Sequence, residues 1–407
     1  MAAKEKEGRT LAWPLMGVAG MLLIATTYGM ARFGVGLLAP VLVAERPGLA
    51  GAIGIAAAGQ YVSYGVAAAT AAGWVDRNPR LGVLLAGGTA TTGCLGIAAA
   101  QDGATFVGAV LVAGAGAGFA SPALVRVVDG FVPSARRALT QSVVNTGTAV
   151  GVIGAGAVAS VATRAGVAWV VMAACCAAAG TGAWVLAVRG RAPTGRVPGA
   201  EGPSVQGLVA SLSVPVMAAV VAGVGSAFVW TFGPLLLAEG GVVAPDDSGG
   251  LWIGLGAGGL LGVLTGALVD RAGLRRGWVL TAAVLALATG GLGAALATTG
   301  VVLAHAAMAV FGAAYMALSG ALILWARDVR PEAGGAGTSL LFIALGAGQA
   351  VGSALVGGLR DIVPPTALAA GAGAVCLVSA ILGALPSTHG RRRVRARAPS
   401  RHPAAPA

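Results

Sequence analysis

The stretch Gly266-Ala-Leu-Val-Asp-Arg-Ala-Gly-Leu-Arg-Arg276 is a charged turn between two long apolar segments. An earlier stretch, Ala72-Gly-Trp-Val-Asp-Arg-Asn-Pro-Arg80, has the same Asp-Arg pair 194 residues upstream. Because this offset is kept through different kinds of residue, it indicates an internal duplication whose unit is half of the chain, not a short solenoid repeat. Two further pairs share the offset: Pro40 with Pro234, and Glu45 with Glu239.

The composition is typical of an integral membrane protein. Of the 407 residues, 57% are hydrophobic and only 10% are charged, and the mean hydropathy is +0.86; a soluble domain has about 25% charged residues. The 68 glycines fit helices that pack closely through small residues in lipid. Four cysteines lie in apolar segments without metal-site spacing, so we expect small buried residues and no metal: Cys94, Cys175, Cys176 and Cys376.

Twelve apolar segments are long enough to cross a bilayer, which takes about 20 residues. The one long polar stretch between them contains three prolines and predicts a linker between two bundles of six helices. The predicted spans are 13–43, 51–74, 81–100, 104–127, 139–162, 166–188, 209–237, 249–269, 278–298, 301–325, 334–358 and 366–386. The predicted divisions are an N-terminal segment 1–10, a first bundle 11–188, a linker 189–207, a second bundle 208–386 and a basic tail 387–407.

The basic residues indicate the orientation of these spans. With the N-terminus inside, 22 of the 26 Lys and Arg residues lie in inside segments, 3 in outside segments and one, Arg32, within a span. This asymmetry predicts cytoplasmic termini and a cytoplasmic linker in a plasma membrane of the bacterial type. It also explains the net charge of +12 without nucleic acid, because the chain has no basic stripe with interleaved aromatic residues. Two roles stay open for the six arginines after Pro386: binding anionic lipid headgroups, or setting topology alone.

Twelve spans in two halves, a central linker and a charged turn after spans 2 and 8 resemble the major facilitator superfamily over nearly the whole chain. The resemblance implies two pseudo-symmetric six-helix halves that work by alternating access. Its most specific element is the loop Gly-x-x-x-Asp-Arg-x-Gly followed by two basic residues. The second copy matches this loop at Gly266, Asp270, Arg271 and Gly273, with the basic pair displaced by one position to Arg275 and Arg276. The first copy has Ala72 and Pro79 in place of glycines but keeps Asp76, Arg77 and Arg80.

Two other signatures of the superfamily are incomplete. Val110 stands where helix 4 has an Arg before its Gly-x-Gly run, and Val152 stands where the antiporter motif of helix 5 has a proline. Antiport is therefore less favoured but stays open. The opening of the chain, from Ala31-Arg32-Phe33 to Gly59-Gln-Tyr-Val-Ser-Tyr-Gly65, resembles the YbfB/YjiJ-like branch, which implies no particular substrate.

Arg32 is the strongest candidate for a binding site, because it lies within span 1, eight residues before Pro40. A guanidinium facing lipid at that depth would cost at least ~2.5–3.5 kcal/mol, so Arg32 should face the interior of the bundle. The matching position of the second half is Ser226, so the shared scaffold does not require the charge. The alternative is structural, an Arg that holds helices 1 and 2 together through carbonyls and tyrosine hydroxyls. We predict a cavity where Arg32 binds an anionic or carbonyl-rich group, assisted by Tyr28, Gln60, Tyr61 and Tyr64.

Span 5 and the second half supply further candidates. Gln141, Asn145 and Thr148 form one polar stripe on a helix, which either lines the cavity or bonds to another helix. In the second half Trp230 is the candidate for substrate contact. Weaker candidates there are His305, which fits the membrane interface better than a proton carrier, Tyr315 and Gln349.

The resemblance also implies a gate at the two charged turns. When the cytoplasmic side is closed, turn arginines would pair with acids at the ends of spans 4 and 10. The turn aspartates would accept backbone N–H groups at the starts of helices 11 and 5, where helix dipoles favour anions. The alternative is a merely solvated basic loop. The residues concerned are the arginines Arg77 or Arg80 and Arg271 or Arg275, the span-end acids Asp129 and Asp328, and the turn acids Asp76 and Asp270.

The function predicted from these features is transport. All 14 Asp and Glu residues lie in loops or at span ends, so a proton would have to use His305, a substrate group or a span-end acid; facilitated diffusion stays open. The chain has none of the P-loop, nucleophile-elbow or His-Glu-x-x-His motifs, so we expect neither enzyme activity nor a cofactor. We predict a monomeric secondary transporter that exports a small organic molecule. The alternatives are uptake of a small anion held by Arg32, and a ligand sensor with a transporter fold that does not transport.

Overall fold

The computed structural model describes residues 2–189 and 205–385, so the predicted tail 387–407 and most of the linker lie outside the described residues. Within the described part, twelve helical segments are long and apolar enough to cross a membrane. The first runs from Trp13 to Glu45 and the last from Pro365 to Ala384. The predicted all-α, multi-pass membrane protein is therefore confirmed, and the side of the membrane that each end faces stays a prediction.

The helices of the first half form spans 1 to 6 in chain order. Span 1 consists of three consecutive segments and span 2 starts with a short 3₁₀ turn, whereas each of the other four spans is a single helix. The bounds are α1 (Ala2–Ile24), the π-helix η1 (Ala25–Arg32), α2 (Gly34–Glu45), η2 (Pro47–Ala52), α3 (Ile53–Ala72), α4 (Pro79–Ala99), α5 (Gly103–Phe131), α6 (Ser134–Val161) and α7 (Ala165–Arg189).

The second half repeats this order after the short helix α8 (Val205–Ser211). Its first span is again divided by a π-helical segment, and its second span ends in the charged turn. The bounds are α9 (Ser213–Ala227), the π-helix η3 (Phe228–Phe232), α10 (Gly233–Glu239), η4 (Pro245–Asp247), α11 (Ser248–Gly259), η5 (Leu260–Leu264), α12 (Thr265–Ala272), α13 (Leu274–Thr298), α14 (Val301–Val329), η6 (Pro331–Ala333), α15 (Gly334–Leu359) and α16 (Pro365–Ala384).

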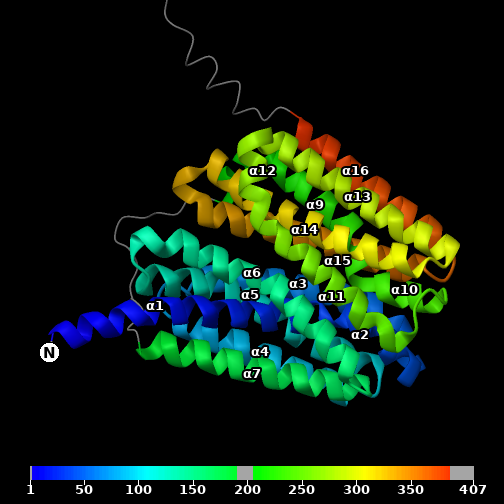
Figure 1. The fold of residues 1–407 in the computed structure, drawn as a ribbon, viewed down its shortest axis with the longest axis horizontal. Coiled ribbons are helices and arrows are strands. Elements are labelled where there is room, and N and C mark those ends of the chain that lie inside the picture. Colours follow the sequence, from blue (N-terminus) through cyan, green and yellow to red (C-terminus); the bar gives the residue numbers. More distant parts are fainter. Residues whose placement is uncertain (1, 190–204, 386–407) are drawn as a thin grey trace, which may run out of the picture.

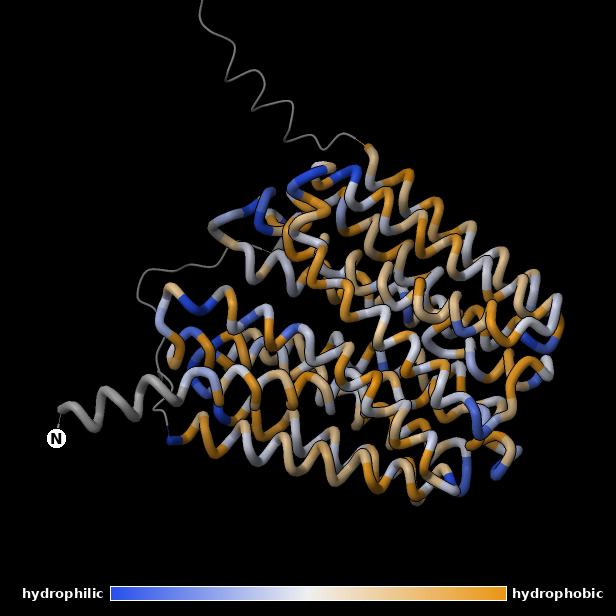
Figure 2. The backbone as a smooth tube through the Cα atoms, viewed as in Figure 1, coloured by the Kyte–Doolittle hydropathy of each residue, from blue (hydrophilic) through white to orange (hydrophobic). Residues whose placement is uncertain are grey.

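The two halves lie side by side (Figure 1). We call the face where α3 and α12 end the charged-turn end, and the opposite face, where α2 and α10 end, the Glu45 end. The ribbons of the halves meet near α2, α10 and α11 and diverge toward the charged-turn end, between α6 and α12 (Figure 1). Hydrophobic residues cover the lengths of the helices, and hydrophilic residues gather at the helix ends (Figure 2).

Close approach between the halves depends on small residues. On the α3–α15 contact, a Cβ added to Gly54 would lie only 2.8 Å from Cα of Gly357. On the α6–α11 contact, a Cβ on Gly156 would lie 2.7 Å from the carbonyl oxygen of Gly249. Without side chains at these positions the helix backbones can touch, which is how helices associate in lipid, where no hydrophobic effect drives them together.

Spans 1 and 7 are both interrupted by a π-helical segment, and the interruptions shape the centre of the molecule. In η1 the helix widens, and the N–H of Phe33 donates to the carbonyl of Tyr28, five residues earlier, at 3.1 Å. In span 7, Pro234 has no N–H to give to the carbonyl of Trp230, four residues earlier. That carbonyl faces Gly36 so closely that a Cβ there would lie 1.9 Å from its oxygen. The crossing of spans 1 and 7 therefore requires glycine at position 36.

Candidate functional site

Arg32 lies at the end of η1 and is almost completely buried, with 6% of its surface exposed. Its Nη2 donates to Oε1 of Gln349, on α15 of the other half, at 3.2 Å. The sequence prediction placed Arg32 in the interior of the bundle. Its burial and the contact with the second half agree with that placement.

Four aromatic rings surround the guanidinium. Such contacts stabilise a cation by about 2 kcal/mol or more when it is desolvated, and together they compensate part of the cost of burying the charge. The distances from Arg32 Cζ to the ring centroids are 4.1 Å for Tyr64, 5.0 Å for Tyr61, 5.2 Å for Phe33 and 5.4 Å for Tyr28.

Hydrogen bonds fix the positions of several of these side chains. The hydroxyl of Tyr28 bonds to Oγ of Ser121 on α5 at 2.7 Å and lies 3.5 Å from the hydroxyl of Tyr64. Gln60, predicted to bind substrate, donates through Nε2 to the carbonyl of Ala31 at 3.3 Å. This bond holds α3 against the backbone beside Arg32, and substrate binding by Gln60 stays a prediction.

The second half supplies an aromatic cluster centred on Trp230. The Trp230 ring stacks on Phe33 of the first half, with centroids 3.9 Å apart and an angle of 19° between the planes. Its edge contacts include the ring of Tyr315, whose hydroxyl accepts a hydrogen bond from Nε2 of Gln349 at 3.1 Å. Trp230 also makes edge contacts with Trp252 and Phe311.

The structure thus joins Arg32, Tyr28, Gln60, Tyr61, Tyr64 and Trp230 in one cluster at the interface of the halves. Gln349 and Tyr315, the weaker candidates from the sequence, belong to the same cluster. Phe33, Ser121 and Trp252 also contact it, although the sequence did not indicate them as site residues. A buried polar residue in a span, such as Gln349, is itself a signal. The partners of Phe33 and Trp252 could not be found from sequence, because they lie on other spans.

The charge of Arg32 has no acidic counterpart in the part of the chain that the structure describes. Its one polar partner there is the neutral Gln349, and its Nε has no hydrogen-bond partner among the described residues. The indole Nε1 atoms of Trp230 and Trp252 are likewise buried without an acceptor in that part of the chain. An unpaired buried donor costs about 1–3 kcal/mol. The site therefore presents donors that an acceptor-bearing molecule would satisfy.

Among the described residues, no hydrogen bond links Gln141 or Asn145 to the Arg32 cluster. Gln141 donates to Asn145 one turn further along α6, at 3.3 Å. At 100° per residue, Gln141 shares a helix face with Val152, which is fully buried and faces the interior. Asn145 is exposed although it shares a face with Gly156, which packs against α11. Whether these side chains line a cavity or bond to another helix stays a prediction.

The predicted gate residues lie at the charged-turn end. Asp76 forms an ion pair with Nε of Arg126 on α5 at 2.5 Å, a partner within the same half that sequence reasoning did not name. Arg77 reaches back to the carbonyl of Gly73 at 3.5 Å, and Nε of Arg80 is buried without a partner among the described residues. Asp129, Asp270 and Arg271 are exposed. Because the halves diverge at this end, pairing across them in the closed form stays a prediction.

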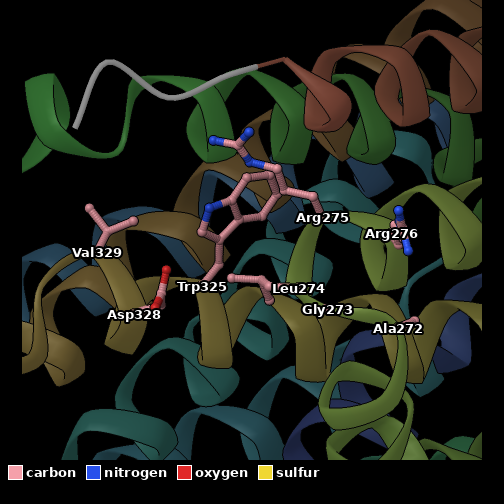
Figure 3. A pocket seen from close by; sticks show the side chains of 8 residues that line it. All are labelled: Ala272, Gly273, Leu274, Arg275, Arg276, Trp325, Asp328 and Val329. Atoms are coloured by element: carbon pink, nitrogen blue, oxygen red, sulfur yellow. The ribbon is translucent and has the colours of Figure 1, made fainter. Parts of the chain in front are cut away.

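A hollow of about 340 Å³ opens beside the second charged turn, between the start of α13 and the end of α14 (Figure 3). Arg275 and Arg276 lie on its α13 side, and Asp328 and Trp325 on its α14 side (Figure 3). The predicted partners Arg275 and Asp328 therefore line one hollow within the second half. It is far along the chain from Arg32 and belongs to the gate region, not to the central cluster.

Two acids of the described chain have partners at the Glu45 end, and the absence of a carboxylate from mid-membrane stays a prediction. At the Glu45 end, Glu45 accepts the backbone N–H of Ala165 at 3.0 Å, and Glu239 pairs with Arg360 at 2.7 Å. Nδ1 of His305 lies 3.0 Å from the carbonyl of Val301, in the first turns of α14. No group of three or more His, Cys, Asp or Glu residues that could hold a metal occurs among the described residues.

The family model of the Major Facilitator Superfamily matches residues 21–353, which is most of the chain. This chain belongs to the Major Facilitator Superfamily. No curated protein matches it by sequence. The YbfB/YjiJ-like branch stays a prediction.

Solved structures of Major Facilitator transporters have the same fold. A structure of the nucleoside transporter NupG is similar with a TM-score of 0.68 and 11% identity, over 92% of this chain and 98% of that one. A D-xylose-proton symporter is similar with a TM-score of 0.68 and 18% identity, over 94% of this chain and 98% of that one. At these identities the likeness shows the fold. Membership of the superfamily indicates a transporter and not an enzyme, as the sequence predicted.

Proposed function

We propose that this protein is a secondary transporter that moves a small organic molecule across the membrane by alternating access, with the Arg32 cluster as its substrate site. The observation that carries the proposal is the Arg32–Gln349 hydrogen bond, since it joins the two halves at their interface. A molecule that binds Arg32 there contacts both halves, so its binding free energy can differ between the outward-open and inward-open forms. Such a difference is what a ligand needs to shift a conformational equilibrium.

The charged turns are the proposed gate. In the described conformation the halves meet toward the Glu45 end and diverge at the charged-turn end (Figure 1). Asp76 and Asp270 would stabilise the reverse arrangement by reaching helix N-termini of the opposite half. We place the charged-turn end in the cytoplasm and propose that net movement is outward, as the family resemblance favours, in a monomer.

A second candidate function is uptake of a small anion. It is favoured by the lack of an acidic partner for Arg32 among the described residues, because a buried cation without a counter-ion attracts an anionic ligand. The third possibility, ligand sensing without transport, would use the same cluster. A measurement of ligand flux across the membrane distinguishes sensing from the two transport functions.

The direct test is release from proteoliposomes loaded with an equimolar mixture of anionic, neutral and cationic small molecules. Mass spectrometry of the outside medium should show one chemical class leaving faster than from protein-free liposomes, and the difference should disappear with Arg32→Ala. Oriented vesicles then give the direction. Release at the protein-free rate for every class would reject transport of these classes and favour sensing.

Alternating access itself can be tested by spin-label distances in a background without the native cysteines. Ala72→Cys with Gly335→Cys reports on the charged-turn end, and Gly51→Cys with Gly358→Cys on the Glu45 end; all four positions are exposed. We expect the first distance to shorten as the second lengthens when a transported molecule is added. Distances that do not change together would contradict a rocking motion.

A further inference from the structure

The guanidinium edge of Arg32 that carries Nε and Nη2 is only half occupied. Arginine binds a carboxylate most strongly when two parallel N–H groups meet its two oxygens. On this edge Nη2 donates to one amide oxygen, Oε1 of Gln349, and Nε has no partner among the described residues. The neutral Oε1 of Gln349 thus occupies this edge, where a carboxylate would place two negatively charged oxygens.

The surroundings of this edge are aromatic and have few free polar groups. Tyr28 bonds to Ser121, and Thr231 bonds to Ser353 at 2.9 Å, so these hydroxyls already have partners. The fully buried side-chain donors of the cluster without a partner in the described chain are N–H groups, those of Arg32, Trp230 and Trp252. A polyhydroxylated ligand such as a sugar needs many donors and acceptors, which this surface does not offer. A ligand with one acceptor group and an apolar body fits it.

The shape of the cluster favours a flat body. Phe33 and Trp230 stack nearly parallel across the two halves, and Trp230 contacts the edges of three more rings. A flat ring can replace one partner in such a stack and keep the favourable geometry, whereas a puckered ring cannot. Position 346, beside Arg32, has no side chain: a Cβ on Gly346 would lie 3.7 Å from Arg32 Nη2 and 3.4 Å from the Tyr64 ring.

We propose that the substrate is an aromatic carboxylate, that its two oxygens bind Nε and Nη2 of Arg32, and that it displaces Oε1 of Gln349. This inference rests on the proposed transport function and specifies its substrate class. Displacement breaks the hydrogen bond between Arg32 of the first half and Gln349 of the second, while Gln349 keeps its bond to Tyr315. Binding therefore removes one contact that holds the halves in the described conformation.

The test is binding of benzoate to the purified full-length protein, followed by thermal shift and by tryptophan fluorescence. Benzamide has the same shape without the charge, cyclohexanecarboxylate has the charge without the flat ring, and uridine and D-xylose are neutral comparisons. We expect benzoate to bind and the neutral molecules not to, with cyclohexanecarboxylate weaker than benzoate. Equal effects of benzoate and benzamide, or no effect of benzoate, would overturn the proposal.

Two substitutions examine the half-occupied edge. Arg32→Lys keeps the charge but loses the two-pronged geometry, so benzoate should bind about tenfold more weakly or worse. Gln349→Glu places a carboxylate of the protein itself on Arg32, so it should abolish benzoate binding and raise the unfolding temperature. The matched control is Gln101→Glu, at an exposed turn of the Glu45 end, which should bind benzoate like the wild type.

The outcomes separate this inference from the proposed function. If Arg32→Lys does not fold, Gln349→Glu still decides, because a variant that binds benzoate like the wild type would overturn the displacement of Gln349. If benzoate binds as expected but no aromatic carboxylate crosses proteoliposomes under an imposed gradient, the site stands and the transport function fails. If another class of molecule is transported and benzoate does not bind, transport stands and this inference fails.

Discussion

Spans 1 and 7 are copies of one helix that differ in chemistry. Both contain a π-helical segment, both have a proline at the matching position, and both end in a glutamate. Where span 1 has Arg32, span 7 has Ser226; where span 7 has Trp230, span 1 has Gly36. The shared features shape the bend of the helix, and the differing ones meet at the centre. The duplication therefore supplies a symmetric scaffold, while charge comes from one half and aromatic surface from the other.

The largest expected effect comes from giving the second half the charge of the first. Ser226 is fully buried, and its hydroxyl donates to the carbonyl of Gly223 within the same helix at 3.1 Å. Ser226→Arg would bury a cation among close-packed helices, at a cost of several kcal/mol. We expect little folded protein in detergent by size-exclusion chromatography.

Ser226→Ala is the control for this substitution. It removes one local hydrogen bond and should leave the folded yield and the unfolding temperature close to those of the wild type. Normal folded yield of Ser226→Arg would mean that both halves can accommodate a central charge. The asymmetry would then be a matter of sequence history and not of packing.

The second-largest expected effect comes from a substitution where spans 1 and 7 cross. Gly36→Ala adds a Cβ that would lie 1.9 Å from the carbonyl oxygen of Trp230, and this oxygen belongs to the backbone and cannot rotate away. We expect a loss of about 1–3 kcal/mol in stability, seen as a lower unfolding temperature, and a longer Gly51–Gly358 label distance. Gly48→Ala, where nothing lies within 4 Å of the added Cβ, is the matched control. Equal behaviour of the two variants would show that the crossing is not closely packed.

The crossing of spans 1 and 7 separates what can be predicted from the sequence from what cannot. The hydropathy pattern was sufficient to predict twelve spans, because hydropathy is a local property of each segment. The 194-residue offset was sufficient to predict two halves, because the signal is repeated along the chain. The helical period put Tyr28 on the face of Arg32, since these residues are one turn apart. The contacts of Phe33 with Trp230 and of Arg32 with Gln349 join residues that are 197 and 317 positions apart. A helix face can be predicted from its own sequence, but the helix that packs against it cannot.

The two charged turns offer a smaller contrast. Asp76 is paired with Arg126, with side chains 43% and 29% exposed, whereas Asp270 is exposed. Asp76→Asn should lower stability by about 0.2–1 kcal/mol through the lost ion pair, and Asp270→Asn should change it less. If the gate works in both halves, each substitution should also lengthen the Ala72–Gly335 label distance, because the closed form loses a contact. Populations equal to those of the wild type in both variants would reject the gate.

The smallest expected effect lies at the Glu45 end, where one half has a helix cap that the other lacks. Asp102 precedes α5 and accepts the backbone N–H groups of Ala104 at 2.9 Å and Thr105 at 3.0 Å, whereas Gly300 precedes α14 without a side-chain cap. These bonds, chiefly the backbone N–H of Thr105, hold the pKa of Asp102 below its usual value. A carboxyl whose pKa is lower in the folded state adds stability above its unfolded pKa and loses that contribution as the pH falls through the folded pKa.

Asp102→Ala should therefore lower the unfolding temperature slightly at neutral pH, and the difference from the wild type should disappear as the pH falls below the lowered pKa of Asp102. Gly300→Asp, which gives the second half the cap of the first, should raise the unfolding temperature with the same dependence on pH. The measurement is thermal unfolding of the three proteins across this pH range. A difference that stays constant with pH would show that the cap acts through the shape of the turn and not through the charge of the carboxylate, and the halves would then differ here in backbone geometry alone.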